Sequence, residues 1–326
     1  MLLCLFCSAS AANYLTFTAG EDGASFWIIR KGADGPDVQY SLDGGESWNV
    51  CEVGKRVRLK KMGDKALLKG ENPDGFSRGE KSYTHFVMSG PIYASGSVMS
   101  LIDGAKDIQT IPNDYCFYGL FERCSSLQQA PELPATTLSA YCYSRMFRKC
   151  SSLRRMPLLP ATVMAEGCYQ GMFCYCNNLM QVSSLPSTTL AERCYEDMFL
   201  HCRRLVYTPT LPATRLAPYC YNGMFFRCVS MTEAPALPAT MLADECYAHM
   251  FEGCSNLAYV KVAFIDWWAE DHGERWRDGV RKERLETFLW LSGVSDFGTF
   301  VCSSDLSIVF DVNRVPKDWK VVFFDE

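Results

Sequence analysis

The feature that most constrains the fold is a 26-residue repeat in the middle of the chain. Two series of cysteines step by 26 residues: Cys116, Cys142, Cys168, Cys194, Cys220 and Cys246, and then Cys124, Cys150, Cys176, Cys202, Cys228 and Cys254. The motif LPAT or LPST keeps the same spacing from Leu133, Leu159, Leu185, Leu211 and Leu237. A fixed period of about 20–50 residues indicates stacked supersecondary units, and leucine-rich repeats occupy the range of about 20–29.

Each unit has two parts. The segment LRRMPLLP (153–160) is short and rich in proline, which predicts a strand that leaves through a turn. In the other part, apolar residues form two rows with a spacing of four: Leu138, Cys142, Met146 and Cys150, and beside them Tyr143 and Phe147. Adjacent rows of this kind are typical of the apolar face of a helix. We therefore expect one short strand and one short helix, interrupted at Gly171, Pro218 and Gly223.

The units LPATTLSAYCYSRMFRKCSSL (133–153) and LPATRLAPYCYNGMFFRCVSM (211–231) resemble the BspA-like leucine-rich repeats of surface and phage proteins of gut Bacteroides. The resemblance covers roughly residues 108–262. It implies an α+β leucine-rich-repeat solenoid that recognises or adheres to an extracellular partner. It supplies no catalytic residues.

The flanks divide the remaining chain. Residues 13–100 show short alternating segments separated by turns such as Asp43-Gly44-Gly45, which predicts a β-sandwich-like domain. The repeats then occupy 101–262, and 263–326 hold five of the seven tryptophans, as expected of a segment that caps the last repeat. Residues 1–12 are either a degenerate export signal or a disordered terminus, because their apolar run is short and lacks a basic flank. No stretch approaches the roughly 20 apolar residues of a transmembrane helix.

The LPxT motif is not a sortase signal in this setting. It occurs five times, internally, and glycine never follows the threonine. A physical role explains it better, since leucine fills the core, proline ends a strand and threonine caps the next turn.

The repeat cysteines are expected to be buried thiols. Residues eight apart on one helix lie about 12 Å apart, whereas a disulfide requires Cα atoms within roughly 4.4–6.8 Å. A bond between columns, such as Cys124 with Cys142, stays open. The sequence has no paired C-x₂₋₄-C knuckles of a structural zinc site, and we expect no metal and no cofactor.

Composition and motifs also bear on function. The net charge of −5 does not favour a nucleic-acid partner. The strand RVRLKK (56–61) could contact an acidic polysaccharide, but a solvated basic edge that discourages pairing between sheets is the better explanation. The four histidines are scattered, without a triad order or a phosphate loop, so we expect no enzyme and no catalytic residues.

We therefore expect a non-enzymatic recognition or adhesion protein at the cell surface or outside the cell, with a protein or glycan partner. The alternative is a phage tail protein or another virion component that contacts the host. The oligomeric state stays open. Variable residues after each strand leucine are the candidate ligand-binding set: Arg154, Arg155, Gln181, Tyr207 and Glu233. Trp267 and Trp268 are candidates for stacking on a glycan.

Overall fold

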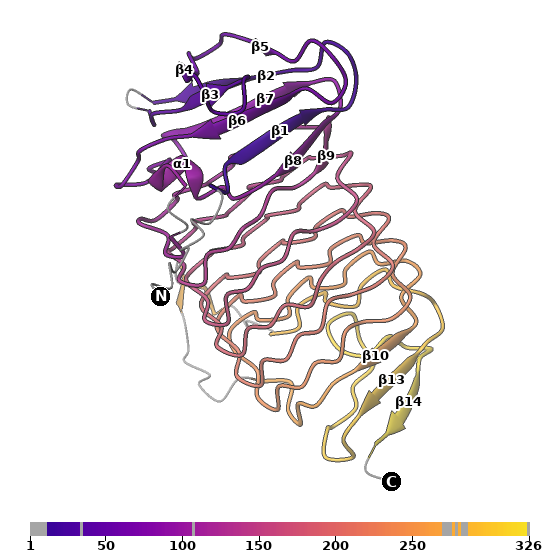
Figure 1. Ribbon diagram of the computed structural model, residues 1–326. Coiled ribbons are helices and arrows are strands. Elements are labelled where there is room, and N and C mark those ends of the chain that lie inside the picture. The colour runs from indigo at the N-terminus through magenta and orange to yellow at the C-terminus, as the bar shows by residue number, and fades with distance from the viewer. Residues whose placement is uncertain are drawn as a thin grey trace, which may run out of the picture.

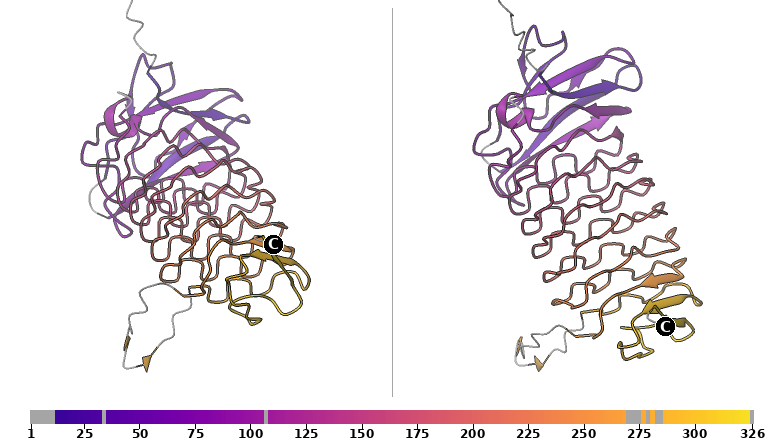
Figure 2. Two further views of the ribbon diagram at one scale, coloured as in Figure 1. Left: turned by 90° about the horizontal axis from the view of Figure 1, so that it is seen from below. Right: turned by 60° about the horizontal axis from the view of Figure 1, so that its bottom comes forward.

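The computed structural model describes residues 12–32, 35–105, 108–268 and 286–324, together with the backbone of 276–277 and 280–281. A β-rich unit stands at one end, a stack of repeats follows it, and a small sheet lies at the other end (Figure 1). The repeats run one above another along a single axis, so segments 26 residues apart lie side by side (Figure 2).

The N-terminal unit consists of two packed sheets. The six-stranded sheet has the order β4-β3-β6-β1-β8-β9, and the three-stranded sheet has the order β5-β2-β7. The bounds are β1 (Leu15–Ala19), β2 (Ser25–Lys31), β3 (Gln39–Ser41), β4 (Asn49–Val50), β5 (Val57–Arg58), β6 (Lys65–Lys69), β7 (Tyr83–Ser89), β8 (Ile92–Ser95) and β9 (Leu127–Gln129). Phe17 of β1 packs edge-on against Phe26 and Phe86 of the opposite sheet, with ring centroids 5.0 and 5.1 Å away. Alternating burial along β1 leaves one face of each strand for this core.

The expected α+β leucine-rich-repeat solenoid, with a helix in each repeat, is wrong. The regular secondary structure of the described residues is nearly all β, with 1% helix and 23% strand, and its strands gather in small sheets. Within the described residues, the one α-helix is the single turn α1 (Ser100–Asp103), which precedes the repeats. The strand segments of neighbouring repeats meet mostly through isolated bridges, such as Arg155 with Gln181, instead of one continuous solenoid sheet.

A ribbon of consecutive tight turns replaces the expected helix. In this ribbon every second amide donates within the repeat, as Met146 N–H does to the Tyr143 carbonyl three residues back at 3.2 Å. The amides between them donate to the next repeat, as Phe147 N–H does to the Met172 carbonyl at 2.9 Å. Both kinds of bond recur from repeat to repeat and leave the buried backbone of the ribbon satisfied. We call this part of each repeat the turn side and the part with the strand segments the strand side.

The left-handed backbone of every fourth residue explains why the ribbon is not a helix. In the second repeat these residues are Tyr141, Arg145 and Lys149, and across the six repeats their φ angles lie between 46° and 72°. An α-helix requires negative φ throughout, so one such residue in four excludes it. The turns nevertheless repeat every four residues, and two of each four side chains point inward. This is why the sequence shows i,i+4 apolar rows.

The inward side chains form files that run along the stack. Tyr143, Tyr169, Tyr195, Tyr221 and Tyr247 stack with centroids 5.8–6.1 Å apart. A parallel file of phenylalanines from Phe121 to Phe251 has spacings of 5.4–5.8 Å. Stacked rings of this kind stabilise a core beyond the area that they bury.

The second cysteine of each repeat has a specific partner. The Cys150 thiol donates to the Phe121 carbonyl of the preceding repeat at 3.1 Å, and the same bond recurs at Cys176, Cys202, Cys228 and Cys254. The repeat cysteines are free thiols, and all 15 cysteines in the described residues are buried. Cysteine suits this position because it is small and apolar and still offers a donor.

The C-terminal segment continues the stack. Amides of the sixth repeat donate to residues 286–292, as Phe251 N–H does to the Trp290 carbonyl at 2.9 Å, which adds a seventh ribbon. The Trp290 ring lies against Tyr247, Phe251 and Phe300 and covers the end of the core. The parallel sheet of β10 (Tyr259–Lys261), β13 (Thr299–Cys302) and β14 (Lys320–Phe323) lies beside it, and β11 (Trp276–Arg277) pairs with β12 (Val280–Arg281). In the part of the chain that the structure describes, no helix is long and apolar enough to cross a membrane.

Two glycines of the third repeat provide a matched test of the turn side. Gly167 and Gly171 both have positive φ, but a Cβ at Gly167 would overlap the Tyr141 ring, whereas at Gly171 the nearest atom, Arg145 Cγ, is 3.6 Å away. We expect Gly171→Ala to cost about 1–2 kcal/mol of unfolding free energy, from its backbone conformation alone. Gly167→Ala should cost at least about 1 kcal/mol more, measured by urea denaturation. Equal losses would contradict the packing of Tyr141 on Gly167, and adding Tyr141→Ala should remove the difference.

Candidate binding surface

The strand side carries the five residues predicted to bind a ligand, and all five are exposed. Arg155 forms a parallel bridge with Gln181, and the Gln181 amide donates to the Arg154 carbonyl at 3.2 Å. The structure therefore brings these three residues together on neighbouring repeats.

Tyr207 and Glu233 lie at the equivalent positions of the next two repeats. Glu233 forms a parallel bridge with Tyr259 of β10, so the surface continues onto the C-terminal sheet. Among the described residues, no β-bridge joins Tyr207 to either neighbour, and its side chain is 74% exposed. We call the set Arg155, Gln181, Tyr207, Glu233 and Tyr259 the strand-side row.

Sequence reasoning missed Tyr259. It follows Leu257 by two residues, as Tyr207 follows Leu205, so the repeat itself carried the signal. Tyr259 was overlooked because the LPAT motif does not recur after this leucine. The structure shows that it completes the row.

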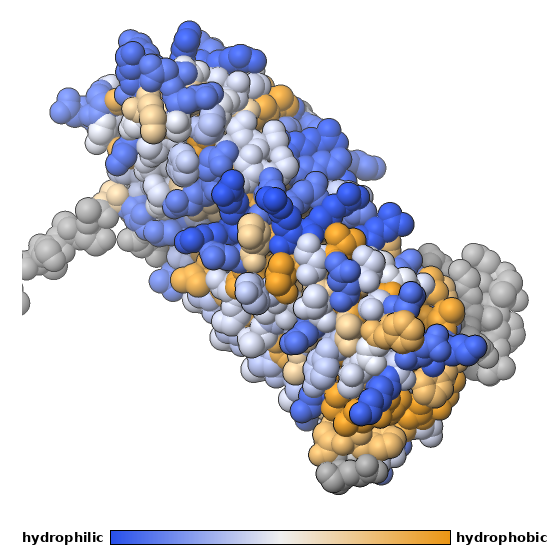
Figure 3. Space-filling model, turned by 90° about the vertical axis from the view of Figure 1, so that its right-hand side faces the viewer, coloured by the Kyte–Doolittle hydropathy of each residue, from blue (hydrophilic) through white to orange (hydrophobic). Residues whose placement is uncertain are grey.

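The strand side also exposes large apolar side chains. Met180, Val206 and Tyr207 are 44, 41 and 74% exposed, and Leu158 on the same side is 74% exposed. Figure 3 looks onto this side, where hydrophilic side chains cover the β-rich unit and apolar side chains gather toward the C-terminal end. Contiguous exposed apolar surface with a polar margin is typical of an interaction site.

A shallow depression lies beside the row, between the fourth and fifth repeats. Its lining consists of residues 208–212, Pro235, Ala236 and Pro238, so half of the lining residues are prolines. Proline has no amide donor, so these segments cannot form a regular ladder with their neighbours. The depression is thus a local opening in the strand side.

The tryptophans predicted to stack on a glycan lie elsewhere. Trp267 is only 4% exposed, its indole N–H donates to the Ser307 carbonyl at 2.7 Å, and its ring stacks on Phe300 at 6.1 Å. Trp267 is therefore part of the end core and cannot offer a face to a sugar. Trp268 is half-buried, with the Arg314 guanidinium 5.6 Å from its ring. Neither belongs to the strand-side row.

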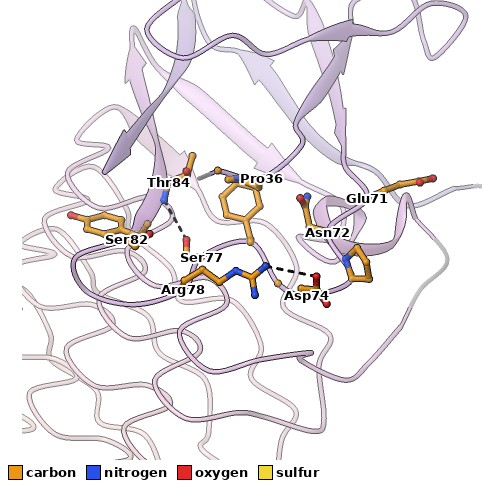
Figure 4. Close-up of a pocket in the computed structure, with 13 residues that line it drawn as sticks. Pro36, Glu71, Asn72, Asp74, Ser77, Arg78, Ser82 and Thr84 are labelled. Carbon is orange, nitrogen blue, oxygen red and sulfur yellow. Dashed lines mark hydrogen bonds and ion pairs between the residues drawn. The ribbon is translucent and has the colours of Figure 1, made fainter. Parts of the chain in front are cut away.

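A second pocket lies where the β-rich unit meets the first repeat (Figure 4). Asn72 Nδ2 donates to the carbonyls of Asp37 and Leu101 at 2.8 and 2.6 Å, and the Ser77 hydroxyl accepts the Thr84 amide at 3.3 Å. Arg78 reaches Asp74 at 3.8 Å across the opening. These polar groups hold the loop of residues 71–78 in place, and the Ser77 amide joins it to the Cys116 carbonyl at 2.8 Å. The pocket therefore lies beside the contact that joins the β-rich unit to the first repeat.

Burial keeps many titratable groups of the described residues uncharged. Burial raises the pKa of the Cys116 thiol to about 12 and that of Cys174 to about 11, so both stay protonated and unreactive near neutral pH. Burial also lowers the pKa of His85 and His201, and His249 Nδ1 lies 2.6 Å from Glu252. The described part of the chain contains no group of three or more His, Cys, Asp or Glu residues that could hold a metal ion. The CxxC at Cys4 and Cys7 and the fourth histidine, His272, lie outside the described residues.

Comparisons with protein-family models, with curated proteins and with solved structures found no match. The assignment of a function therefore rests on the chain itself.

Asp197 on the turn side predicts a pH-dependent stability. Burial, with the Glu196 charge beside it, raises the pKa of this carboxyl from 3.8 to about 6. The folded state then binds more protons than the unfolded state between these values, so stability should fall as pH rises from about 4 to about 6. Asp197→Asn removes this fall, and we expect the variant to be more stable than the wild type at pH 7 and similar to it at pH 4.

Urea denaturation at both pH values measures the effect. Glu192→Gln, at an exposed acid of the same repeat, is the control and should change little at either pH. An Asp197→Asn variant that gains no stability at pH 7 would contradict the burial of the charged carboxyl.

Proposed function

We propose that this protein is a non-enzymatic recognition protein that acts outside the cell and binds a protein partner through its strand side. The observation that carries the proposal is the strand-side row, in which five consecutive repeats present exposed Arg, Gln, Tyr, Glu and Tyr side chains at one equivalent position. A regular frame with varied side chains provides an extended binding surface.

The chemistry of the row favours a protein over a glycan. Tyrosine and arginine are enriched among residues that dominate binding energy at protein interfaces. Here Tyr207, Arg154 and Arg155 are exposed beside Met180 and Val206. Arg155 and Glu233 carry opposite charges three repeats apart, which would orient a partner of complementary charge along the row.

The thiols are compatible with an oxidising environment. Free cysteines are uncommon in secreted proteins because disulfides form there. In this protein, burial raises the pKa of the repeat thiols, and the second cysteine of each repeat donates to a carbonyl. Such thiols expose little thiolate to an oxidant. The resemblance of the repeats to BspA-like surface proteins points in the same direction.

A binding screen with the full chain tests the proposal. The chain is presented to arrays of extracellular proteins and glycans, and each hit is titrated against two variants of matched composition. The first variant, Arg154→Ala/Arg155→Ala/Tyr207→Ala, truncates three exposed side chains of the strand side. The second, Arg123→Ala/Arg227→Ala/Tyr175→Ala, truncates the same residue types on the turn side. We expect the first variant to weaken a protein hit by at least about tenfold and the second to leave it unchanged. Wild-type affinity of the strand-side variant for every hit would refute the proposal.

A further inference from the structure

A second surface with different chemistry runs along the turn side. The third left-handed position of five consecutive ribbons carries Arg123, Lys149, Tyr175, His201 and Arg227, which we call the basic file. Each backbone amide of the file donates to the next repeat at 2.7–2.8 Å, so the five positions are fixed in line. The basic file contains no carboxylate.

Aromatic rings hold two cations of the file, Lys149 and Arg227, in place. Lys149 Nζ lies over the Tyr175 ring, 5.6 Å from its centroid, and Tyr175 stacks on the His201 ring at 4.6 Å. His201 lies 5.8 Å from Phe226, whose ring also carries the Arg227 guanidinium at 5.3 Å. A cation over a ring is ordered but keeps its full charge.

Little negative charge offsets the basic file. Arg123 is 70% exposed, and Glu122, at 3.9 Å, is held closer by Arg148 at 2.7 Å. Lys149 and Arg227 have no carboxylate within ion-pair distance among the described residues. Burial lowers the pKa of His201, and the positive charges of Arg227 and Arg203 lower it further.

The β-rich unit, which adjoins the first ribbon, carries further cations over rings. The Phe86 ring of β7 stacks on Phe121 of the first ribbon at 5.5 Å, so this strand lies directly beside the repeats. Lys31 lies over the Tyr83 ring at 4.7 Å, and Arg56 lies over Trp27 at 4.5 Å. Both cations are again seated on rings.

We propose that the basic file binds a linear acidic polysaccharide, whose carboxylate or sulfate groups lie along the stack axis. The ring-seated cations are ordered before the ligand arrives, so binding loses little side-chain entropy. The proposal does not rest on the proposed function, because it concerns another side of the stack and another class of ligand.

The wide spacing of the cations in the basic file favours an acidic polysaccharide over a nucleic acid. Four steps of about 4.8 Å between repeats place three full cations along roughly 19 Å. A DNA strand carries one phosphate per about 3.4 Å of axis and would leave most of its charges unpaired here. A sugar chain with one acidic group in one or two units matches the sparse file better. The net charge of −5 also opposes a densely charged polyanion at longer range.

The test titrates the full chain with polygalacturonate, chondroitin sulfate, neutral dextran and single-stranded DNA. We expect both acidic polysaccharides to bind, the binding to weaken between about 50 and about 300 mM NaCl, and dextran not to bind. Lys149→Glu/Arg227→Glu should weaken polysaccharide binding by at least about tenfold. Arg154→Glu/Arg155→Glu changes the net charge equally on the strand side and should bind as the wild type does.

The variant Arg123→Gln/Arg227→Gln neutralises two exposed side chains without reversing their charge. It is used in place of Lys149→Glu/Arg227→Glu if the latter variant unfolds. It too should weaken binding, and thermal melts verify the fold of each variant. Three results would overturn the proposal: no binding of either acidic polysaccharide, equal loss in the strand-side control, or tighter binding of DNA than of both polysaccharides.

Discussion

The hydrogen bonds between neighbouring repeats are the constraint on which the rest of the structure depends. Alternate amides of each ribbon donate to carbonyls of the next repeat, so residues 26 apart are held in register along the stack. This register aligns the tyrosine and phenylalanine files and places each second cysteine under a carbonyl of its neighbour. It also fixes the exposed positions on both sides. The strand-side row and the basic file are therefore consequences of one backbone pattern.

Much of the core could be predicted from the sequence, because the repeat shows which residues face inward. Cys142, Met146, Phe147 and Cys150 are all buried, as the rows of four implied. The conformation of the same segment was predicted wrongly. A helix and a ribbon of turns both give apolar residues a spacing of about four along the sequence. Glycine at the left-handed positions would distinguish the two, but this signal is weak. Only five of these left-handed positions hold glycine, as at Gly167 and Gly171, and the others hold larger residues such as arginine, tyrosine or lysine.

The candidate sites were predictable to different degrees. Residues after each strand leucine are exposed because the leucine before them fills the core, which is why Arg154 and Tyr207 were found from the sequence. Trp267 was misplaced because its role depends on Phe300 and Ser307, which are more than 30 residues away. The basic file was not seen, since its members are variable residues that only the inter-repeat register aligns. Side chains brought together by distant contacts leave little local trace in a sequence.

The central claim is that the amide of Phe147 bonds to the Met172 carbonyl in the next repeat, as the ladder requires. Scalar coupling across hydrogen bonds, measured by NMR on labelled protein, tests it most directly. The structure predicts a coupling between the Phe147 amide nitrogen and the Met172 carbonyl carbon, and equivalent couplings along the stack. A coupling from Phe147 to the Tyr143 carbonyl, four residues earlier, would indicate a helix and contradict the account.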